Sequence, residues 1–141
     1  MTTAFSDSAD FWNKRFNTPD YIFGKDPNEY LQAQATLHLK KGASVLCVAD
    51  GEGRNSVWLA KQGMQVDAFD VSEIALSKAI ALAKEEVVQV QFSLASSDTW
   101  DWQPNHYDAV VGIFIQFADP VMRTRLFAQM VSTLRPGGML I

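Results

Sequence analysis

The stretch "SVLCVADGEGRNSVWLA", residues 44–60, decides the fold. It begins with an apolar run, residues 44–49, of the kind found in strands that are buried on both faces. Gly51 and Gly53 then allow a tight turn, because glycine adopts backbone angles that other residues avoid. Residues 54–63 follow with the apolar spacing of an amphipathic helix. A buried strand, a glycine turn and a helix in this order indicate one βα unit of a parallel sheet.

The same alternation continues along the chain. Asp26 is the expected N-cap of the first clearly patterned helix. Alternating elements of this kind predict an α/β fold with a doubly wound, mostly parallel sheet of about five strands and right-handed crossovers. Residues 1–141 are expected to form a single domain, with the aromatic-rich residues 1–26 as a leader or lid. Helices are predicted at 27–41, 54–63, 72–85 and 119–134, and strands at 44–49, 65–70, 88–94, 107–114 and 139–141.

Composition and charge exclude several classes of binding partner. The net charge is −4 and no basic stripe is present, so the sequence lacks the electrostatic footprint of a nucleic-acid binder. The single cysteine, Cys47, excludes an intramolecular disulfide and a multi-cysteine metal site, and fits a reducing compartment. No signal peptide and no apolar run of about 20 residues is present. We therefore expect a cytoplasmic protein with a small-molecule partner and no nucleic-acid or membrane partner.

The glycine turn is the expected ligand site, because doubly wound sheets bind ligands at the carboxyl ends of their strands. Asp70 ends the next predicted strand, where an acid can accept both hydroxyls of a ribose. A nicotinamide dinucleotide would require a third glycine at position 56, which is Ser56. Asp50 and Glu52 would also lie close to its pyrophosphate. These residues favour a ligand with a cationic or zwitterionic group.

Four stretches together resemble the class I S-adenosylmethionine-dependent methyltransferases, and more narrowly the small tellurite-resistance-type bacterial methyltransferase-like proteins. They are "VLCVADGEGRN", "VDAFDVSEIALSKA", "YDAVVGIFIQF" and "LRPGGMLI". The N-terminal "FWNKRF…YIFGKDPNEYL" is similar to the leader helix and lid of that family. The resemblance runs from about residue 10 to the end of the chain.

The resemblance implies S-adenosylmethionine as cofactor and assigns a binding role to many residues. The glycine turn would lie against the methionine part, the end of the second strand would hold the ribose and adenine, and the residues after the third strand would face the adenine edge. Phe114 to Phe117 would face the methyl-transfer pocket. The implied cofactor-binding residues are Ala49, Asp50, Gly51, Gly53, Asn55, Asp70, Val71, Ser72, Ser96, Ser97, Asp98, Phe114, Arg15 and Tyr21.

Three departures from the family pattern stand out. The family's Asp-x-Gly-x-Gly-x-Gly motif places Cys47 at the acid and Ala49 at the first glycine. The acid that normally follows the third strand falls on Ser96, with Asp98 two residues further on. Family members usually continue through two more strands and a helix, so the chain is expected to lack those last two strands. A remnant that binds cofactor without catalysis is therefore an alternative.

For several side chains the sequence allows two interpretations. Tyr21 and Phe23 are candidates for a lid over the cofactor, and Arg15 for a partner of its carboxylate or for a surface ion pair. The aromatic residues of 11–16 have the spacing of ordinary helix packing. Glu52 and Arg54 either pair with each other or contact the cofactor. No catalytic constellation and no metal site is visible.

The sequence therefore predicts methyl transfer from S-adenosylmethionine to a small-molecule acceptor. The alternatives are the non-catalytic remnant and, less favoured, an NAD-dependent oxidoreductase. A sheet whose fifth strand lies at an edge also predicts self-association, most simply as a homo-oligomer formed through the sheet edge near the C-terminus.

Overall fold

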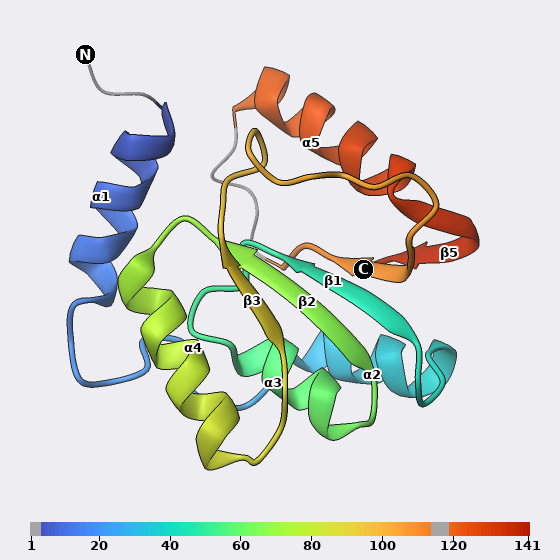
Figure 1. Ribbon diagram of the computed structural model, residues 1–141, viewed down its shortest axis with the longest axis horizontal. Helices are drawn as coiled ribbons and strands as arrows, with labels where there is room; N and C mark the ends of the chain where they lie inside the picture. Colours follow the sequence, from blue (N-terminus) through green and yellow to red (C-terminus); the bar gives the residue numbers. More distant parts are fainter. Residues whose placement is uncertain (1–3, 114–118) are drawn as a thin grey trace.

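Five parallel strands form the centre of the protein. The computed structural model describes residues 4–113 and 119–141. The strand order is β3-β2-β1-β4-β5, and every neighbouring pair is parallel (Figure 1). This order confirms the predicted doubly wound α/β sheet. The strands are β1 Ser44–Val48, β2 Gln65–Asp70, β3 Gln91–Leu94, β4 Tyr107–Val111 and β5 Leu134–Leu140.

Helices cover both faces of the sheet, which explains why β1 is apolar throughout (Figure 1). Val45 and Cys47 pack in one core with α2 and α3, whereas Leu46 and Val48 pack in another with α5. Successive residues of a strand point to opposite faces, so both sets are buried. The helices are α1 Ala4–Phe16, α2 Glu29–His38, α3 Arg54–Lys61, α4 Glu73–Glu85 and α5 Pro120–Ser132.

Side-chain caps set the first turns of three helices. Ser72 and Asp119 accept hydrogen bonds from the backbone N–H groups three residues later, 3.0 and 2.9 Å away, as expected of N-caps. The prediction that Asp26 is the N-cap of α2 is wrong. Its N-cap is Asn28, whose Oδ1 accepts from the N–H of Leu31 at 3.1 Å.

Two strands do not begin where predicted, and β4 ends at Val111 rather than at residue 114. β3 begins at Gln91 rather than at residue 88, because Val87 has a left-handed backbone, with φ of 57°, and the turn after α4 extends past it. β5 begins at Leu134 rather than at residue 139. The "RPGG" sequence, which follows the helix predicted at 119–134, lies within this edge strand, where its pairing with β4 shifts register. An edge position tolerates proline, which donates no backbone hydrogen bond.

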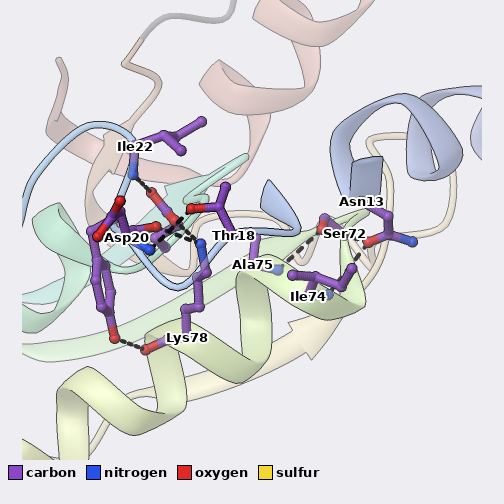
Figure 2. A network of polar contacts seen from close by, with 10 residues as sticks. Asn13, Thr18, Asp20, Ile22, Ser72, Ile74, Ala75 and Lys78 are labelled. Carbon is purple, nitrogen blue, oxygen red and sulfur yellow. Dashed lines mark hydrogen bonds and ion pairs between the residues drawn. The ribbon is translucent and has the colours of Figure 1, made fainter. Parts of the chain in front are cut away.

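No helix within residues 4–113 and 119–141 is long and apolar enough to cross a membrane. The helix α1 packs against α4 at the side of the sheet (Figure 1). Asn13 Oδ1 fastens this contact, because it accepts hydrogen bonds from Ser72 Oγ at 2.6 Å and from the N–H of Ile74 at 3.3 Å (Figure 2). The first helix is thereby tied to the N-terminus of α4.

Candidate functional site

A cavity opens at the carboxyl ends of the strands, where doubly wound sheets bind their ligands. The glycine loop after β1, the end of β2, the loop after β3 and Ile113 after β4 all contribute to its wall. The wall is completed by Trp12, Phe16, Phe23 and Gly24 from the N-terminal part of the chain and by Met122 and Leu126 of α5. The structure thus brings together nine of the residues predicted to bind the cofactor: Ala49, Asp50, Gly51, Asn55, Asp70, Val71, Ser96, Ser97 and Asp98.

The glycine loop is built from left-handed residues. Ala49, Gly51 and Gly53 have φ values of 51°, 64° and 88°. Ala49 therefore keeps the left-handed conformation that the family's first glycine would adopt more easily. Gly53 does not line the cavity. A Cβ at this position would lie 2.8 Å from the Cβ of Ala79, so Gly53 instead allows α3 to pack closely against α4.

Asp70 stands beside the glycine loop at the end of β2. Its Oδ2 accepts from the N–H of Gly51 and its Oδ1 from the N–H of Ser72, both at 2.9 Å. Burial raises the pKa of this carboxyl, and the backbone hydrogen bonds oppose that shift. A carboxylate offers about four lone-pair sites, so two backbone bonds leave Asp70 able to accept from ligand hydroxyls.

Asp50 is a second buried acid of the loop. Its Oδ2 accepts from Ser56 Oγ at 2.6 Å, while Oδ1 has no partner among the described residues. Burial raises the pKa of Asp50 to about 7, and the hydrogen bond from Ser56 partly opposes that shift. Ser56, the position where a dinucleotide fingerprint has glycine, is thus fully buried and engaged with the loop.

Glu52 is the third buried acid, and its partner is not the one that the sequence suggested. Arg54 was a candidate partner, yet the carboxylate pairs with Lys78 of α4, with Nζ to Oε2 at 2.8 Å. Its Oε1 accepts from the N–H of Ile22 at 2.9 Å (Figure 2). The guanidinium of Arg54 lies 5.8 Å from the ring centre of Phe23.

An aromatic wall faces the three acids. Trp12 and Phe16 stack with ring centres 5.5 Å apart, and Phe23 meets Phe16 edge to face at 6.5 Å. All three line the cavity. The helical spacing of Trp12 and Phe16 predicted ordinary helix packing. Spacing alone does not distinguish an aromatic residue of the core from one that lines a cavity.

Four predicted residues lie beside the cavity without lining it, and one cannot be placed. Gly53 packs on α4, and Ser72 caps α4 and donates to Asn13. The hydroxyl of Tyr21 donates to the carbonyl of Lys78 at 2.8 Å, and Arg15 lies over the rings of Trp12 and Phe23. Phe114 lies outside the described residues.

Sequence reasoning missed Met122 and Leu126, which line the cavity from α5. Their spacing of four residues is that of any core-facing helix, so no local signal distinguishes them. Phe69 and Ile113, near the ends of β2 and β4, also line it, and the general rule for doubly wound sheets would have found both. Among the described residues, no group of His, Cys, Asp and Glu side chains is arranged to hold a metal ion.

Comparisons with known proteins agree with this geometry. A family model described as a methyltransferase domain matches residues 45–138. The tRNA (uracil(54)-C(5))-methyltransferase of Pyrococcus horikoshii is 29% identical over 120 residues, which cover 77% of this chain and 29% of that protein.

Solved structures show the same fold. TehB from Haemophilus influenzae superposes with a TM-score of 0.70 and 20% identity, covering 93% of this chain and 43% of that one. Phosphoethanolamine N-methyltransferase 2 of Haemonchus contortus, in complex with phosphomonomethylethanolamine and S-adenosylhomocysteine, has a TM-score of 0.72 and 24% identity. That alignment covers 99% of this chain and 35% of the other. The chain thus spans less than half the length of each of these three proteins.

Proposed function

Since the chain belongs to the methyltransferase-domain family, we propose that it binds S-adenosylmethionine in the cavity and transfers the methyl group to a small-molecule acceptor. One observation carries the proposal: the buried acids Asp50 and Asp70 line the same space as the aromatic wall, beside Glu52, whose charge is already paired with Lys78. Such a surface suits a cation and disfavours a pyrophosphate. S-adenosylmethionine has both a sulfonium and an ammonium group.

The residues present fit this cofactor. Asp70 keeps free lone pairs for ribose hydroxyls, and Gly51 leaves the loop without a side chain on the cavity side. An aromatic face attracts a nearby cation by roughly 0.5–2 kcal/mol, which suits the rings of Trp12 and Phe16. The bound cofactor supplies a methyl group on a good leaving group. The protein then has to orient the acceptor and exclude water.

A small acceptor is favoured by the charge and by the lining of the cavity. The net charge of −4 and the absence of a basic stripe argue against a phosphate backbone. Near α5 the wall of the cavity has the apolar side chains of Ile113, Met122 and Leu126, beside Asp98, which pairs with Arg125 of this helix at 2.9 Å. We infer that an acceptor with an apolar body binds there, next to the methyl donor.

Calorimetry tests cofactor binding directly. We expect the 141-residue chain to bind S-adenosylmethionine and S-adenosylhomocysteine, and not NAD. Asp70→Ala should weaken binding at least tenfold, because a hydrogen bond to a charged group contributes about 1.5–3 kcal/mol. Asp101→Ala is the matched control, since that acid is exposed and lies outside the cavity. Absence of binding to either S-adenosyl compound would refute the proposal.

Turnover is tested separately. We expect S-adenosylhomocysteine to accumulate when the loaded protein meets a panel of small acceptors. Tight binding without any product across the panel would favour the alternative, a domain that holds the cofactor without catalysis.

A further inference from the structure

The carboxylate of Glu52 joins the glycine loop to the leader segment, which we define as residues 17–28 between α1 and α2. Its side chain is only 2% exposed, and its two oxygens are bound by different elements. Oε1 accepts from the N–H of Ile22 in the leader segment, and Oε2 accepts from the ammonium of Lys78 in α4 (Figure 2).

Lys78 holds the leader segment in two further ways. Its ammonium also donates to the carbonyl of Asp20 at 2.7 Å, and it lies 5.8 Å from the ring centre of Tyr21. The carbonyl of Lys78 accepts from the hydroxyl of Tyr21 at 2.8 Å. One residue of α4 therefore contacts Asp20, Tyr21 and Glu52 at once.

These contacts lie directly behind two walls of the cavity. Ile22 is followed by Phe23 and Gly24, which line the cavity, and Glu52 follows Gly51 in the glycine loop. Lys78 itself does not line the cavity. Its ion pair with Glu52 consequently joins the leader segment, which contributes Phe23 and Gly24 to the cavity wall, to the glycine loop.

The burial of this pair sets it apart from the other ion pairs. The side chain of Lys78 is 14% exposed, whereas those of Lys61 and Glu86 in their pair are 45% and 37% exposed. An exposed pair contributes little, but removing one member of a buried pair leaves the other charge buried without compensation. Loss of Lys78 would therefore drive Glu52 toward solvent, and Ile22 would lose its acceptor.

We propose that Lys78 is a positioning residue for the cofactor: it holds the leader segment against the glycine loop and so keeps Phe23 and Gly24 in the cavity wall. The inference rests on the proposed function, because it assigns a role within the same site. By reciprocity, a ligand that contacts both walls stabilises the attached leader segment.

The test compares wild type, Lys78→Met, Lys78→Arg and the double variant Glu52→Gln/Lys78→Met, with Lys61→Met as the matched control. S-adenosylhomocysteine affinity is measured by calorimetry, and tryptic cleavage after Lys25 reports attachment of the leader segment. Lys78→Met should bind at least about tenfold more weakly and be cut about tenfold faster. Lys78→Arg should recover most of the affinity because it keeps the charge, and Lys61→Met should match wild type.

The double variant separates positioning from folding, because it removes both charges of the pair and leaves neither one buried without its partner. We expect it to fold, to be cut faster than wild type and to bind between wild type and Lys78→Met. Wild-type affinity in either Lys78→Met or the double variant would overturn the inference, as would unchanged cleavage after Lys25. If wild type itself does not bind S-adenosylhomocysteine, the proposed function fails, and cleavage of the unliganded proteins still decides whether Lys78 holds the leader segment.

Discussion

Replacing Gly53 by alanine should destabilise the protein through two separate effects. Its φ of +88° lies in the left-handed region, where a Cβ costs about 1–2 kcal/mol. The added Cβ would also lie 2.8 Å from the Cβ and 3.0 Å from the Cα of Ala79. Since part of this contact is helix backbone, α3 and α4 must move apart, and such overpacking costs about 1–3 kcal/mol. We expect a total loss of about 2–5 kcal/mol out of the 5–15 kcal/mol typical of a domain.

Gly42→Ala shows the first effect alone, so the difference between the two variants gives the second. Gly42 has nearly the same φ, +89°, and a Cβ there would meet nothing within 4 Å. This variant should lose only the backbone contribution, about 1–2 kcal/mol. Urea unfolding followed by far-ultraviolet circular dichroism gives both free energies of unfolding. Equal losses in the two variants would show that Gly53 is not required for the packing of α3 on α4.

Three further predictions follow from the loop and the sheet edge. Ala49→Gly should raise the free energy of unfolding by about 1 kcal/mol, because φ of 51° suits glycine; a lower value in urea would contradict this. Folding raises the pKa of Asp50 from 3.8 to about 7, so the folded state binds this proton more tightly than the unfolded state. The free energy of unfolding that this contributes is present in full below pH 3.8 and is lost as pH rises through about 7. The difference in free energy of unfolding between Asp50→Asn and wild type should therefore move by about 2–3 kcal/mol in favour of the variant as pH rises from about 5 to about 8. A difference that does not change with pH would refute the raised pKa. We also propose self-association through β5, which pairs only with β4 among the described strands, so sedimentation should show concentration-dependent dimers rather than a clean monomer.

The sheet and the glycine loop could be predicted from the sequence because both depend on local patterns. The apolar run of β1, the two loop glycines and Asp70 each have a geometry that follows from a few neighbouring residues. β5 was harder, because Pro136 and Gly137 lie within the strand and are usually read as a turn. Only pairing with β4 makes this segment a strand.

Contacts between distant residues account for most of what the sequence did not show. Glu52 pairs with Lys78, 26 residues away, although Arg54 is nearer in sequence. Trp12, Phe16 and Phe23 line the cavity because α1 packs on α4, and their spacing alone cannot tell a cavity wall from a core. Amphipathic patterns show that a face is covered, and the tertiary structure decides what covers it.

The attachment of α1 and the leader segment to α4 has a consequence for the order of folding. Their hydrogen bonds to this helix connect residues 57 to 61 positions apart, as in Tyr21 with Lys78 and Asn13 with Ile74. During synthesis the N-terminal residues leave the ribosome first, yet their partners emerge only after β1, α3 and β2. Contacts of such sequence separation form late, because closing a long loop loses chain entropy. We therefore expect α1 and the leader segment, although they are synthesised before α4, to be among the last elements to reach their native positions.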